Sequence, residues 1–194
     1  MPSDRIRVAV ILTSVRKGRF GPTIANWVVG TASQRDDIEV DLVDLADFPL
    51  PTALTDEPSP EVAELLGAFS ARLSRADGFV IVTPEYNHSF PASLKAAVDW
   101  TQHEWHAKPV GFVGYGGLAG GLRAVQQLRQ IFNELHAVPV RDAVSFHGPW
   151  GQFDAEGNLT DGAHAESAAK VLWDRLTWWA QATKEAKKIR PYDN

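Results

Sequence analysis

Residues 78–100, GFVIVTPEYNHSFPASLKAAVDW, join a strand, a polar loop and a helix in direct succession. The run Phe79–Val82 is apolar without alternation, which is typical of a strand buried on both faces of a parallel sheet. A helical spacing follows, with a core-facing stripe at Leu94, Ala97, Val98 and Thr101. The loop between them lies at the carboxyl end of the strand, where open α/β sheets bind their ligands.

Two local signals place the start of this helix. Pro91 suits the first turn, where a missing N–H has no consequence, and Ser89 just before it is a candidate cap. The sequence therefore predicts a helix from about Pro91, with the polar loop confined to Thr83–His88.

The rest of the chain repeats the alternation of strand and helix. Further strands are expected at 6–13, 38–45, 109–115 and 138–146, and further helices at 22–34, 60–76, 121–135 and from the capping residue Asp161 onward. Five strands separated by helices predict an α/β fold, a doubly wound five-stranded parallel sheet between two helical layers. In the strand order 2-1-3-4-5, one of two common orders, the loops after strands one, three and four converge on one cleft.

Composition excludes several classes of protein. The 194 residues suit a single domain over 1–194, and 44% hydrophobic with 22% charged residues is an ordinary globular balance. The absence of cysteine excludes disulfides, thiolate metal sites and a thiol nucleophile. The net charge of −5 and the lack of a long basic stripe disfavour nucleic-acid binding. No run is long enough for a membrane span and no signal peptide is evident, so a cytoplasmic location is expected.

The loop after the first strand, Thr13–Thr23, combines hydroxyls, three cations and two glycines just before a helix. The unpaired N–H groups and the positive dipole of a helix start favour anions, and arginine adds paired donors that match phosphate oxygens. The loop carries neither the G-x-G-x-x-G nor the Walker pattern. A phosphate site is the favoured interpretation, and a solvated basic turn is the alternative.

The loop after the fourth strand, Tyr115–Gly121, contains four glycines. Such a loop lets the backbone approach a flat ligand closely. A tight link between strand and helix would need the same residues, so this loop alone does not decide between the two.

The aromatic residues and histidines outside these loops have structural interpretations. Seven tryptophans are many for this length; Trp27, Trp173 and Trp179 suit the core, whereas Trp100 and Trp105 suit an interface. His103 and His106 are spaced i, i+3, but no further zinc ligand lies nearby, so a surface or interface role is favoured.

Together the three loops resemble the NADPH-dependent FMN reductase family. The resemblance rests on Ser14-Val15-Arg16-x-Gly18, on Pro84-Glu85-Tyr86-Asn87-x-Ser89-x-Pro91-x-x-Leu94-Lys95-x-x-x-Asp99-Trp100, and on Gly116-Gly117-x-x-Gly120-Gly121-x-Arg123. It covers roughly residues 6–135, and the central block is its specific part. It implies the flavodoxin-like fold, FMN as cofactor and NADPH or NADH as electron donor.

The resemblance also implies which residues hold the cofactor. The FMN phosphate would be bound by Ser14, Arg16, Arg19, Phe20, Gly21, Pro22 and Thr23. The flavin ring would be lined by Pro84, Glu85, Tyr86 and Asn87, with Tyr115, Gly116 and Gly117 at its far edge. Many members carry Ser and Asn where this chain has Arg19-Phe20, and Arg19 would compensate. The N–H groups of Glu85 to Asn87 are candidate donors to the acceptor edge of the ring.

Two functions follow from this interpretation. The first is an FMN-dependent NAD(P)H oxidoreductase that reduces flavin, quinone, azo or similar small acceptors by ping-pong hydride transfer, with no metal and no catalytic side chain of its own. The alternative is a flavin-binding electron carrier or redox-responsive interaction module. A catalytic acid role for Glu85 is less favoured than an ion pair with a neighbouring cation. The expected assembly is a homodimer or a dimer of dimers, without nucleic-acid or membrane partners.

Overall fold

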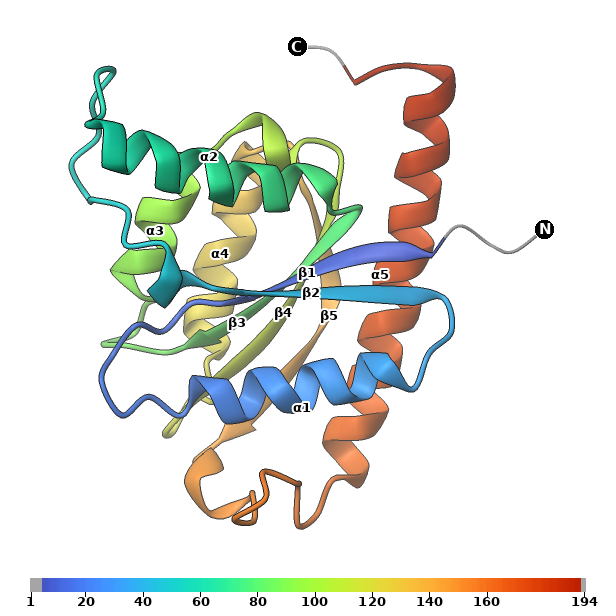
Figure 1. Ribbon diagram of the computed structural model, residues 1–194. Coiled ribbons are helices and arrows are strands. Elements are labelled where there is room, and N and C mark those ends of the chain that lie inside the picture. The colour runs from blue at the N-terminus through green and yellow to red at the C-terminus, as the bar shows by residue number, and fades with distance from the viewer. Residues whose placement is uncertain (1–4, 193–194) are drawn as a thin grey trace.

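The computed structural model describes residues 5–192, and its strands form a parallel sheet in the order β2-β1-β3-β4-β5 (Figure 1). The strands are β1 (Ile6–Leu12), β2 (Ile38–Asp44), β3 (Gly78–Pro84), β4 (Pro109–Gly116) and β5 (Val138–His147). The α-helices are α1 (Gly21–Ser33), α2 (Pro60–Arg75), α3 (Ala92–Asp99), α4 (Leu122–Glu134) and α5 (Ala163–Ile189). Short 3₁₀ turns are η1 (Leu45–Asp47), η2 (His103–Trp105) and η3 (Pro149–Gly151). The predicted doubly wound sheet and its strand order are confirmed.

Helices cover both faces of the sheet. In Figure 1, α1 and α5 lie on one side of the strands, and α2, α3 and α4 lie on the other. Two apolar cores correspond to these two sides: Trp173 of α5 belongs to the first core, and Phe69 of α2 and Phe132 of α4 belong to the second. The chain is therefore a three-layer αβα structure.

Strand β3 lies at the centre of the sheet. All seven of its residues are buried, and it pairs with β1 through Val80 opposite Val10 and with β4 through Ile81 opposite Phe112. This is why Phe79–Val82 shows no alternation, since both faces meet a helical layer.

Two predicted helix caps are wrong. Helix α3 starts after Pro91 without a side-chain cap, because the Ser89 hydroxyl donates instead to Gln127 Oε1 at 2.6 Å. Helix α5 starts after Gly162 rather than Asp161, again without a side-chain cap. In the first case, a partner distant in the sequence takes the hydroxyl that the local pattern assigns to the helix.

Two of the predicted tryptophan environments are also wrong. Trp105 is fully buried between Phe79 and Phe132, with ring centroids at 4.5 Å and 5.1 Å, so it is a core residue and no interface anchor. Trp179 is 39% exposed rather than in the core. Trp173 is buried as predicted, and Trp27 packs partly buried against the same core.

Among residues 5–192, the structure contains no helix that is both long and apolar enough to cross a membrane.

A group of stacked aromatic rings lies beside η2. The His106 ring stacks on His136 at 4.9 Å and meets His103 edge-on at 5.0 Å, while His136 Nδ1 is 2.8 Å from the Tyr192 hydroxyl. His106 is only 8% exposed, so the surface alternative predicted for it is wrong, and the interface alternative stays a prediction. Burial, and then the charges of His103 and His136, lower the pKa of His106 below its usual value.

This lowered pKa predicts a stability that depends on pH between 7 and 5. Because folded His106 resists protonation, the unfolded chain takes up the proton first as the pH falls below about 6.5, and the free energy of unfolding falls. We expect the urea midpoint to drop from pH 7 to pH 5, and His106→Gln to make that drop shallower. The exposed His164→Gln is the matched control and should leave the slope unchanged. An unaltered slope in His106→Gln would contradict the assignment.

Candidate functional site

Three loops meet at the carboxyl edge of the sheet, after β1, β3 and β4. The backbone joins them: Thr13 N donates to Val82 O at 3.1 Å, and Glu85 N donates to Tyr115 O at 2.9 Å. The Ser93 hydroxyl, in α3, donates to Thr13 O at 2.6 Å. The predicted convergence of these loops follows from the observed strand order, in which β1, β3 and β4 are neighbours.

Ser14 links the first loop to the central one. Its side chain is 1% exposed, and its hydroxyl oxygen lies 2.7 Å from the Tyr86 hydroxyl. The two residues were predicted to contact different parts of one ligand, and the structure brings them into direct contact.

Tyr115 points beneath the first loop. A Cβ atom added at Gly21 would lie 2.8 Å from the Tyr115 hydroxyl oxygen and 2.6 Å from Leu12 Cδ1, so a side chain there would displace the ends of both. The Tyr115 hydroxyl is buried near Ser14, and within residues 5–192 it has no hydrogen-bond partner of ordinary geometry. Burial raises the pKa of this phenol well above its usual range. A buried hydroxyl without a hydrogen bond is unfavourable unless a ligand or water supplies that bond.

The cations of the first loop differ in availability. The Arg19 guanidinium donates to both carboxylate oxygens of Asp44, at 2.7 Å for Oδ1, and to Ser14 O. The hydrogen bond to Asp44 raises the pKa of Arg19 above its usual value. Arg16 and Lys17 are exposed, and no ion pair to either is found among the described residues. Asp44 was missed because it ends β2, far from the loop in sequence.

The central loop contains a two-residue turn. Tyr86 and Ser89 exchange backbone hydrogen bonds of 2.8 Å and 3.0 Å around Asn87 (φ 47°) and His88 (φ 75°). Two successive positive φ values are the geometry of a tight hairpin turn, which asparagine tolerates well. The N–H groups of Glu85 and Tyr86 are therefore used within the protein, and the prediction that they face a ligand is wrong for these two.

Glu85 holds the central loop against α4. Its side chain is 9% exposed and accepts from Arg123 N and from the Arg123 guanidinium, both at 3.1 Å. The carboxylate thus occupies the start of a helix, where negative charge is stabilised. The predicted ion pair with a cation is confirmed, in the contact with the Arg123 guanidinium, and the carboxylate also accepts from the Arg123 backbone N–H.

The glycines of the third loop serve different purposes. Gly120 (φ 58°) and Gly121 (φ 86°) have no room for a side chain, because an added Cβ would lie 2.5 Å from Ser145 Oγ or from Tyr115 N. At Gly117 an added Cβ would meet nothing within 4 Å. Close internal packing explains the first two glycines, whereas Gly117 leaves open space over the backbone.

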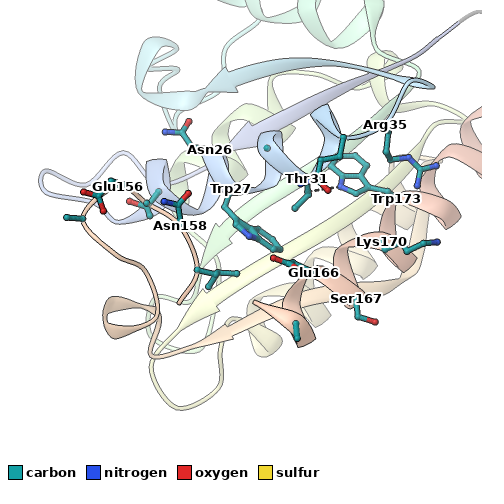
Figure 2. Close-up of a pocket in the computed structure, with 17 residues that line it drawn as sticks. Asn26, Trp27, Thr31, Arg35, Glu156, Asn158, Glu166, Ser167, Lys170 and Trp173 are labelled. Atoms are coloured by element: carbon teal, nitrogen blue, oxygen red, sulfur yellow. Dashed lines mark hydrogen bonds between the residues drawn. The ribbon is translucent and has the colours of Figure 1, made fainter. Parts of the chain in front are cut away.

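A large hollow of about 1160 Å³ lies elsewhere, between α1, α5 and the loop before α5 (Figure 2). Of the predicted site residues it includes Thr23 alone, and Trp27 lines it. Its cations are already paired with acids, Arg35 with Asp37 and Asp174 and Lys170 with Asp174. The exposed Arg16 makes the first loop the better anion site.

Comparison with known proteins connects this geometry to a family. The family model "NADPH-dependent FMN reductase" matches residues 6–151, which include all three loops. The chain belongs to the NADPH-dependent FMN reductase family. It is 37% identical over 148 residues to an NAD(P)H-dependent FMN reductase of Schizosaccharomyces pombe, covering 72% of each chain. It is 33% identical over 187 residues to a 2-hydroxy-1,4-benzoquinone reductase of a Burkholderia species, covering 91% of this chain and 97% of the relative.

Solved structures agree on the fold. The flavoenzyme FerB, an NAD(P)H:(acceptor) oxidoreductase of Paracoccus denitrificans, superposes with a TM-score of 0.73 at 24% identity, over 91% of this chain and 98% of that one. A flavodoxin of Pseudomonas aeruginosa superposes with a TM-score of 0.55 over 89% of this chain. The predicted flavodoxin-like fold, the FMN reductase family, the enzyme class and the cofactors FMN and NAD(P)H are confirmed.

The described residues fit FMN. The unsatisfied Tyr115 hydroxyl, the exposed Arg16 and the first turn of α1 offer hydrogen bonds and positive charge at one end of the edge. The open backbone at Gly117 offers room for a flat ring at the other end.

Proposed function

We propose that this FMN-dependent NAD(P)H oxidoreductase passes electrons to quinones or to similar small acceptors such as flavins and azo compounds. The meeting of a cationic loop, a hydroxyl pair and open backbone at one sheet edge is the observation that carries the proposal. The names of the benzoquinone reductase and of plant NADPH:quinone oxidoreductases, one of them 34% identical over 176 residues, support the acceptor class.

The proposed phosphate contacts come from the first loop and the start of α1: Ser14, Arg16, Arg19, Phe20, Gly21, Pro22 and Thr23. Arg16 is the proposed direct cation, because Asp44 already holds Arg19. Arg19 then acts by fixing the Ser14 carbonyl and the loop that carries it.

The proposed ring contacts come from Pro84, Glu85, Tyr86, Asn87, Tyr115, Gly116 and Gly117. When bound, FMN supplies the hydride chemistry, so that NAD(P)H, a proton and a quinone give NAD(P)⁺ and a hydroquinone. The chain supplies position: the Glu85–Arg123 pair holds one wall. The N–H groups of Asn87 and His88, at the centre of the turn, donate to no other described residue and are the proposed donors to the ring.

The phosphate assignment predicts a loss of cofactor affinity in Arg16→Ala. Removing a hydrogen bond to a charged group should weaken FMN binding by roughly 1.5–3 kcal/mol. Fluorescence titration of the apoprotein with FMN measures this change directly. The exposed Arg75→Ala, at the end of α2, is the control. Equal affinity of Arg16→Ala and the parent protein would remove Arg16 from the site.

The site also predicts the order of the reaction. The segment after β3 lies against the end of β4, since Glu85 N donates to Tyr115 O at 2.9 Å and a Cβ added at Gly116 would lie 3.3 Å from Glu85 Cβ, and it is proposed to cover one face of the ring. We propose that nicotinamide and acceptor use the remaining side in turn, giving ping-pong kinetics. Initial-rate lines at several quinone concentrations should run parallel in double-reciprocal plots. Intersecting lines would mean that both substrates bind together.

We further propose a homodimer or a dimer of dimers, working in the cytoplasm. Trp105 no longer supports the interface, but Trp100, partly exposed after α3, still does. Leu122, 46% exposed at the start of α4, adds a second exposed apolar side chain. Sedimentation at micromolar concentration should give at least the mass of two chains, and Leu122→Glu should lower it. A parent protein that sediments as a monomer would contradict this prediction.

A further inference from the structure

A fourth loop, residues 148–153 after β5, is fastened to the site although the sequence analysis did not assign it there. Gly148 N donates to Gly116 O at 2.7 Å, and His147 Nδ1 lies 3.0 Å from Leu118 O. The Phe153 ring meets Phe20 of the first loop at 5.7 Å. This loop is therefore joined both to the glycine-rich loop and to the first loop.

The fourth loop presents Trp150 to solvent from a fixed support. Pro149 beside it is buried, the 3₁₀ turn closes through Gln152 N to Pro149 O at 2.9 Å, and the Gln152 amide donates to His147 O at 2.6 Å. Trp150 itself is 62% exposed, and within residues 5–192 nothing accepts from its indole N–H. A large aromatic side chain on an anchored turn is preorganised for contact with a ligand.

Other exposed apolar side chains gather at the same edge. Leu118, in the glycine-rich loop, is 91% exposed, and its carbonyl is tied through His147 to the strand end that leads to Trp150. Val15 of the first loop is 50% exposed. Scattered exposed apolar residues need no explanation, but several around one ligand-binding edge indicate an apolar contact surface.

We propose that Trp150 and Leu118 form an apolar wall that binds the ring face of a planar quinone acceptor and selects for larger ring systems. The inference rests on the proposed function and deepens it. A tryptophan face stacks on flat rings, and a second fused ring gains contact area that a single ring lacks. Acceptors without a flat apolar face gain nothing from this wall.

The test compares acceptors in Trp150→Ala, Trp150→Phe and Leu118→Ala. Loss of one aromatic contact should lower kcat/KM for menadione, a fused-ring quinone, about threefold to tenfold in Trp150→Ala, with a smaller loss for 1,4-benzoquinone. Ferricyanide reduction and the bound FMN should stay unchanged. Trp150→Phe should recover most of the menadione rate, and Leu118→Ala should show a weaker form of the same selectivity.

The chain offers a matched control in Trp178, which is 59% exposed on α5. Trp178→Ala should behave as the parent protein with all three acceptors. Three results in Trp150→Ala would each contradict the proposed acceptor wall. They are equal losses with menadione and ferricyanide, a raised KM for NADPH alone, and the kinetics of the parent protein. A parent protein that neither binds FMN nor oxidises NADPH would instead overturn the proposed function, so the two failures are distinguishable.

Discussion

The burial of β3 on both faces and its hydrogen bonding on both edges constrain the rest of the structure. Its neighbours β1 and β4 hold it from either side, and the three carboxyl ends are joined by the Thr13–Val82 and Glu85–Tyr115 backbone bonds. A loop that leaves such a strand starts from a fixed position. This lets a short polar segment hold the Tyr86–Ser89 turn, whose two central residues adopt positive φ values that a loosely held loop would avoid.

At this sheet edge two arginines are paired with acids, and two further cations are not paired among the described residues. Asp44 neutralises Arg19, and Glu85 neutralises Arg123 while binding the first turn of α4. Both acids belong to strand ends or loops of the same edge, so they stabilise the loops that surround the site. Arg16 and Lys17 lack such partners among the described residues. The start of α1 is therefore the positively charged part of this edge.

The sequence predicted those strands and helices whose apolar residues follow a clear local pattern. The apolar run Phe79–Val82 and the helical stripe at Leu94, Ala97 and Val98 reflect burial against whole layers, so the buried strand and the helix after it were predicted from the pattern. Single partners distant in sequence could not be predicted: Gln127 takes the Ser89 hydroxyl, and the core encloses Trp105. For the same reason the sequence did not predict the Asp44 contact to Arg19 or the contact of the fourth loop with Gly116. In both cases the partners lie far apart in the sequence.

The glycine-rich loop shows how structure separates two explanations that sequence leaves equal. Gly120 and Gly121 are required by the chain itself, because Ser145, His147 and the β4 backbone fill the space a side chain would take. Gly117 has no such neighbour, and its φ is not in the left-handed region. A glycine that neither packing nor dihedral angle requires lowers the stability of a chain slightly, through the entropy of the unfolded state. We propose that a bound ring approaching the backbone at Gly117 is the missing reason.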